Sequence, residues 1–131
     1  MFAGIIINTE YELSQLHGKD YPSVREAVGG YIELVMLRGE FEGYALYVNE
    51  EGKINGLPIN DLATAVWEMS FGLYTDIIVG NAVIMSAKTN DEGEHFDLTD
   101  DEVEDLVERI HKAFARYNHP SRSMPRTPKK R

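Results

Sequence analysis

The sequence of 131 residues contains no cysteine. This excludes disulfide bonds, thiol catalysis and any zinc or iron–sulfur site that needs a cysteine ligand. Long apolar runs are also missing, since runs such as residues 5–7 and 77–79 are far shorter than the roughly 20 residues that cross a bilayer. We therefore expect no contact with a membrane. No basic segment precedes the first apolar stretch, so we expect no secretory signal and a cytoplasmic location.

Basic side chains are scarce in most of the chain. Residues 1–117 contain 8 Lys and Arg against 22 Asp and Glu, whereas residues 118–131 contain 5 basic side chains and no acid. The formal charge of −9 therefore averages a body near −14 and a tail near +5. An acidic body repels the phosphates of nucleic acids, so we expect that it does not bind nucleic acid directly.

The charge change at residue 118 coincides with a change in composition. The last fourteen residues include three prolines and show no apolar periodicity. We therefore predict one globular domain over residues 1–117, followed over residues 118–131 by a basic, proline-containing tail that is disordered. Whether the tail only extends into solvent or contacts an acidic surface or RNA stays open.

Apolar residues make up 43% of the chain and charged residues 27%, which is typical of a globular domain. Alternating and β-branched apolar residues predict strands over residues 2–7, 31–37, 44–48 and 76–86, with a break at 80–81, and a short strand over 94–97. Residues 9–17 fit either a short strand or a short helix.

Capping residues mark three helices. Asp20 and Gly29 bracket the first, Asn60 precedes the second over about residues 61–70, and Thr99 with Glu102 forms a capping box for the third over about 100–117. The third is the best supported because its apolar positions follow one continuous helical face. These elements predict an α+β fold, in which a small mixed or antiparallel sheet carries three packed helices.

The sequence contains no recognisable catalytic or metal-binding motif. The four histidines form no helical metal pair, so we expect them at the surface. The turns at 49–52 and 90–93 carry oxygen ligands without the spacing of a calcium loop, and we expect Gly52 and Gly93 to supply positive φ there. Neither a phosphate-binding loop nor a serine nucleophile elbow occurs. We therefore expect no enzyme activity, no metal and no cofactor.

Four ordered motifs resemble an uncharacterised family, a domain of unknown function that is common in bacteriophages and bacterial mobile elements. The motifs are Val28-Gly29-Gly30-Tyr31-Ile32-Glu33, Tyr47-Val48-Asn49-Glu50-Glu51-Gly52, Gly56-Leu57-Pro58-Ile59-Asn60 with Ala63-Thr64, and Val79-Gly80-Asn81-Ala82-Val83-Ile84. The resemblance covers about residues 2–115. It implies no particular activity, but it implies a phage or mobile-element protein that acts in the cytoplasm of a bacterial host.

Six residues are candidates for binding a ligand or partner. They are Tyr31, Tyr47, Asn49, Asn60, Thr64 and Trp67. If the family binds a small ligand, Asn49, Asn60 and Thr64 are the polar groups expected to contact it. The alternative is that these three residues serve as caps and turns. Trp67 lies beside the main apolar stripe of its helix, where it is either an exposed anchor or covers one end of the sheet together with Phe71.

Two functions fit these observations. The first is a non-enzymatic accessory protein whose acidic surface occludes a basic site on a host protein, in part by imitating the charge of DNA, for host takeover or counter-defence. The second is a module that binds and sequesters a small molecule or nucleotide-like signal. The second requires a cleft with convergent polar groups and basic residues, which the body contains in small number.

Overall fold

The computed structural model describes residues 2–117, so the predicted tail lies outside the described residues. The strands are β1 (Gly4–Ile7), β2 (Leu13–Leu16), β3 (Ile32–Met36), β4 (Tyr44–Asn49) and β5 (Ala82–Ser86). The helices are α1 (Tyr21–Val28), α2 (Asp61–Phe71) and α3 (Asp100–Tyr117), with a short 3₁₀ turn η1 (Gly39–Phe41). The strands form one antiparallel sheet in the order β2-β1-β5-β4-β3, which confirms the predicted α+β class.

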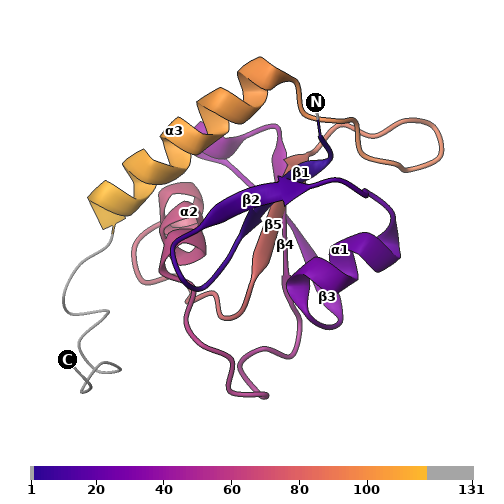
Figure 1. Cartoon of the computed structure of the whole chain (residues 1–131). Helices are drawn as coiled ribbons and strands as arrows, with labels where there is room; N and C mark the ends of the chain where they lie inside the picture. The colour runs from indigo at the N-terminus through magenta and orange to yellow at the C-terminus, as the bar shows by residue number, and fades with distance from the viewer. Residues whose placement is uncertain (1, 118–131) are drawn as a thin grey trace.

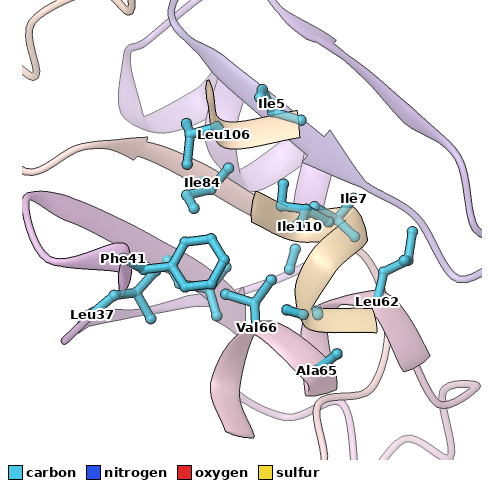
Figure 2. Close-up of a cluster of buried hydrophobic side chains, with 14 of the residues drawn as sticks. Ile5, Ile7, Leu37, Phe41, Leu62, Ala65, Val66, Ile84, Leu106 and Ile110 are labelled. Atoms are coloured by element: carbon cyan, nitrogen blue, oxygen red, sulfur yellow. The ribbon is translucent and has the colours of Figure 1, made fainter. Parts of the chain in front are cut away.

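The two faces of the sheet carry different helices. Figure 1 shows α2 and α3 on one side and α1 on the other. Because side chains alternate along a strand, Ile5 and Ile7 of β1 enter the larger core while Ile6 packs towards α1. Figure 2 shows the larger core, in which residues from β1, β5 and both covering helices meet, with Phe41 and Leu37 at one side.

The predicted caps are present at all three helices. The Asp20 carboxylate accepts a hydrogen bond from the Ser23 amide at 2.8 Å. Hydrogen bonding with the Ser23 side chain, and next with its amide, lowers the pKa of Asp20. The Glu102 amide donates to Thr99 Oγ1 at 3.1 Å, and the Thr99 amide donates to Glu102 Oε1 at 2.8 Å. These two bonds form the expected capping box. Gly29 ends α1 with a left-handed φ of 90°, which glycine adopts without steric cost. The third helix has the bounds that its apolar periodicity predicts.

The strand predicted over residues 76–86 is wrong in its first half. Only β5, from Ala82, pairs within the sheet. Before it, Gly80 takes a φ of 76° and donates its amide to the Pro58 carbonyl at 2.8 Å, while the Ile78 carbonyl accepts from the Asn60 amide. Residues 78–80 therefore bond to the segment that enters α2. Residues 94–97 likewise form only an isolated bridge between Thr89 and His95.

The turn after β4 uses glycine differently from the prediction. Gly93 has the expected positive φ of 80°, but the positive φ near the first turn belongs to Gly56, at 69°, and not to Gly52. Gly52 is buried, and a Cβ there would lie 2.7 Å from Val79 Cγ2. Its small size, rather than its backbone freedom, is what the fold requires. Over residues 2–117, no helix has both the length and the apolar character to cross a membrane.

Candidate functional site

Asn60 lies in the interior of the molecule and not at its surface. Its side chain is fully buried, and Nδ2 donates to the carbonyls of Ile7 and Gly80, both at 2.9 Å. Its Oδ1 accepts from the Ala63 amide at 3.0 Å and caps α2. The side chain thus joins β1, α2 and the segment before β5, and its amide hydrogens are both used inside the fold.

Thr64 continues this buried arrangement one turn along α2. Its fully buried hydroxyl accepts from the Ile78 amide at 2.9 Å and lies 3.4 Å from the Ile78 carbonyl. We call Asn60 and Thr64 the buried polar junction. Each member bonds backbone groups that would otherwise be buried without a partner, Asn60 as the cap of α2 and Thr64 through the Ile78 amide.

Asn49 lies apart from this junction, at the end of β4. Its Oδ1 accepts from the Glu51 amide at 2.9 Å and shapes the turn. It lines a cleft of about 110 Å³ together with Glu33, Glu50, Lys53 and other residues. Because carboxylates line this cleft, it repels phosphate groups and does not favour the nucleotide-like ligand.

The aromatic candidates are spread over different parts of the surface. Trp67 is half-buried; its ring lies 4.5 Å from that of Phe71, and its Nε1 donates to Thr75 Oγ1 at 2.9 Å. These contacts match the covering role proposed for it together with Phe71. Tyr31 is exposed, and the Arg25 guanidinium lies 4.2 Å from its ring centroid.

Tyr47 bonds to a histidine that the sequence did not single out. His95 is buried, so the expectation of a surface histidine is wrong here. Its Nδ1 lies 2.6 Å from the Ser86 carbonyl, which only accepts, so Nδ1 carries the proton and Nε2 accepts from the Tyr47 hydroxyl at 2.8 Å. The arrangement fastens residues 87–97 to the sheet, and burial raises the pKa of Tyr47.

No polarity pattern after the turn at 90–93 signals this buried histidine in the sequence. Glu94 and Phe96 are exposed while His95, between them, is buried. Such alternation is typical of an extended segment lying on a sheet. The distance of 48 residues between His95 and Tyr47 hides the partner from any local pattern.

Acidic side chains gather in residues 90–108, which we call the acidic band. This segment holds ten Asp and Glu and no Lys or Arg. In Figure 1 the loop before α3 runs directly into the first turn of that helix, so the two acid-rich stretches are continuous. Asp101, Glu104 and Glu108 are exposed, and their spacing of three and four residues places them on one outward face of α3.

Few of these charges are neutralised. Lys19 Nζ lies 3.4 Å from Asp97 Oδ1, and Arg109 Nε lies 2.7 Å from Asp105 Oδ2. Asp91, Glu92, Asp101, Glu104 and Glu108 form no ion pair with any residue between 2 and 117. The same part of the chain contains no group of three His, Cys, Asp or Glu side chains placed to hold a metal ion.

A family model described as a domain of unknown function, DUF3846, matches residues 4–111. The chain belongs to this family. Comparison with curated proteins and with solved structures gave no match. The family match covers the whole sheet and most of α3, so the DUF3846 domain includes the buried polar junction, the cleft beside Asn49 and the acidic band.

The DUF3846 domain does not bring the six candidate residues into one site. Asn60 and Thr64 lie together in the interior, Asn49 lines the cleft, and Tyr47 bonds to His95. Tyr31 and Trp67 stack on different neighbours, Arg25 and Phe71. A binding role for these residues stays a prediction, and the larger unexplained feature of the surface is its charge.

Proposed function

We propose that this DUF3846 protein is a non-enzymatic accessory protein that binds a basic surface of another protein through its acidic band. The observation that carries the proposal is the set of ten acids in residues 90–108, a segment that contains no Lys or Arg. Closely spaced like charges raise the local potential, accelerate encounter with an oppositely charged surface and orient the partner.

In this proposal the protein belongs to a phage or mobile element, acts in a bacterial cytoplasm and binds a host protein. The resemblance of the motifs at 28–33, 47–52, 56–64 and 79–84 supports that setting. Many host proteins that bind DNA have basic surfaces shaped for a row of phosphates. Carboxylates spaced along a helix supply a similar row of negative charge, which suits occlusion of such a surface in host takeover or counter-defence.

The test removes charge from the acidic band and compares it with equal removal elsewhere. One variant carries Asp91→Asn, Glu92→Gln, Glu104→Gln and Glu108→Gln; its matched control carries Glu10→Gln, Glu26→Gln, Glu42→Gln and Glu51→Gln. All eight side chains are exposed, so both variants should fold. We expect host proteins captured by the wild type to bind the band variant at least about tenfold more weakly and the control nearly unchanged, as measured by calorimetry with each purified partner.

Two results would reject the proposal. The first is equal affinity of the band variant and the wild type for every captured partner. The second is an equal loss in both variants, because the net charge and not the band would then determine binding. Affinity that falls steeply with added salt is expected for the wild type and not for the band variant.

A further inference from the structure

The strand β3 leaves one edge of the sheet open. It is the last strand in the order and pairs only with β4 among the described strands. The Leu37 amide donates to the Tyr44 carbonyl at 3.0 Å, and the Glu50 amide donates to the Tyr31 carbonyl at 2.8 Å. Because the bonding direction alternates along an antiparallel strand, the amides and carbonyls of Ile32, Leu34 and Met36 point away from β4.

The side chains of these same residues form an apolar row. Leu34 is 47% exposed and Met36 is 55% exposed, on the face of the sheet that α1 covers only in part. The opposite edge strand, β2, instead exposes the polar Ser14 and Gln15. Edge strands are commonly protected by proline, charged side chains or a bulge, and of these β3 has only the charge of Glu33.

The cleft beside Asn49 lies on the other face of this edge. It takes Glu33 from β3, and Val48, Ile78 and Val79 supply apolar walls. Its other charged residues are Glu50, Lys53 and Asp76, of which Lys53 and Asp76 pair with each other. Glu33 and Glu50 have no ion pair with a residue from 2 to 117. Apolar walls beneath unpaired carboxylates suit the aliphatic stem and cationic head of Lys or Arg.

We propose that the β3 edge binds an extended segment of a protein partner, which pairs with Ile32, Leu34 and Met36 and places a Lys or Arg side chain in the cleft beside Glu33. Successive residues of an added strand point to opposite faces, so one segment with alternating apolar and basic residues serves both surfaces. The inference rests on the proposed function in taking a basic protein partner, but it uses a surface separate from the acidic band.

Charge complementarity decides between this occupant and a second copy of the chain. Pairing two β3 strands with Leu34 opposite Leu34 matches the free backbone groups but sets the two Glu33 carboxylates diagonally across the ladder. It also joins two bodies near −14. A basic segment forms the same backbone bonds and meets Glu33 and Glu50 with opposite charge.

The test uses a short peptide, blocked at both ends, that alternates valine and arginine. Its two controls replace arginine by glutamate, or methylate the valine amides so that they no longer donate. With the arginine peptide we expect amide exchange at Leu34 and Met36 to slow at least about tenfold, as measured by NMR. Both control peptides should leave the exchange unchanged.

Variants of the full chain separate the two surfaces. We expect Glu33→Gln to weaken binding of the arginine peptide roughly three- to tenfold and Leu34→Lys to abolish it, with unchanged circular dichroism confirming the fold. The acidic-band variant should retain the peptide. If only the acidic-band variant loses the peptide, the inference is overturned and the acidic band alone is supported as the peptide-binding surface.

Three other outcomes would also overturn it. The methylated peptide could bind as well as the arginine peptide, or peptide binding could leave the exchange at β3 unchanged. Slow exchange at β3 that grows with protein concentration in the absence of peptide would assign the edge to a second copy. If the acidic-band test fails and this test succeeds, the proposed role of the acidic band is rejected and peptide binding by the β3 edge is kept.

Discussion

The buried polar junction and the β3 edge use hydrogen-bonding groups in opposite ways. At the junction, the side chains of Asn60 and Thr64 satisfy backbone groups from three segments. At the edge, the backbone groups of Ile32, Leu34 and Met36 that point away from β4 have no strand beside them within residues 2–117. The motif residues that most resemble a ligand site therefore serve the fold, whereas unused bonding capacity lies in a strand without conspicuous polar residues.

The largest expected effect is at the junction. Asn60→Ala removes the cap and leaves the carbonyls of Ile7 and Gly80 and the Ala63 amide without their partner. Each unsatisfied buried group costs about 1–3 kcal/mol, so we expect the free energy of unfolding to fall by about 3 kcal/mol or more. Urea unfolding followed by circular dichroism measures the loss.

Asn60→Asp is the matched control for this substitution. It keeps the oxygen that caps α2 and loses the two amide donors. If Asn60 instead served a ligand, Asn60→Ala would unfold at the same urea concentration as the wild type.

A smaller effect is expected at the second member of the junction. Thr64→Val keeps the volume of the side chain but removes the acceptor of the Ile78 amide. We expect a loss of about 1–2 kcal/mol in the free energy of unfolding, because one buried amide loses its partner. Thr64→Ser retains the hydroxyl and should lie closer to the wild type; a greater loss in Thr64→Ser than in Thr64→Val would show that the methyl group matters more.

Local sequence patterns account for much of the fold. The Asn60 and Asp20 caps, the Thr99–Glu102 capping box and the periodicity of α3 each depend on residues within one or two turns of a helix, and all are present as predicted. The late start of β5, at Ala82, could not be predicted, since it follows from bonds between residues 78–80 and 58–60 across a long loop.

The candidate site was harder to predict for the same physical reason. The partner of Asn60 in β1 lies 53 residues away, and the strand order alone decides that β3 is an edge. In the sequence, Ile32, Leu34 and Met36 show the alternation of a strand with one buried side, yet Leu34 and Met36 are exposed. Alternation reports a shared face; it does not report whether another element covers that face.

Tyr47, on the strand next to the β3 edge, has a titration that reports on folding. It lies opposite Leu34 in the register but bonds to His95. Burial raises its pKa above the ordinary 10.0, so the neutral phenol favours the folded state. This stabilisation is complete below pH 10 and is lost as the pH rises through the folded pKa. Tyr47→Phe should therefore lose less stability than the wild type between pH 9 and pH 11.

Tyr21→Phe is the control for this titration, because Tyr21 is exposed and lies outside the Tyr47–His95 pair. Its unfolding free energy should follow the wild-type pH dependence. Parallel alkaline curves for Tyr47→Phe and the wild type would contradict a link between Tyr47 ionisation and folding. Burial also raises the pKa of Tyr44, so some alkaline loss is expected to remain in Tyr47→Phe.

The smallest expected effect on stability is at the edge itself. Leu34 packs only in part, so Leu34→Lys should change the free energy of unfolding by no more than about 0.5 kcal/mol, as for most surface substitutions. Leu46→Ala on the adjacent strand, where the side chain is fully buried, should cost about 2–5 kcal/mol in the same urea titration. A loss above about 1 kcal/mol in Leu34→Lys would mean that the apolar row belongs to the core, and the contrast between edge and junction would fail.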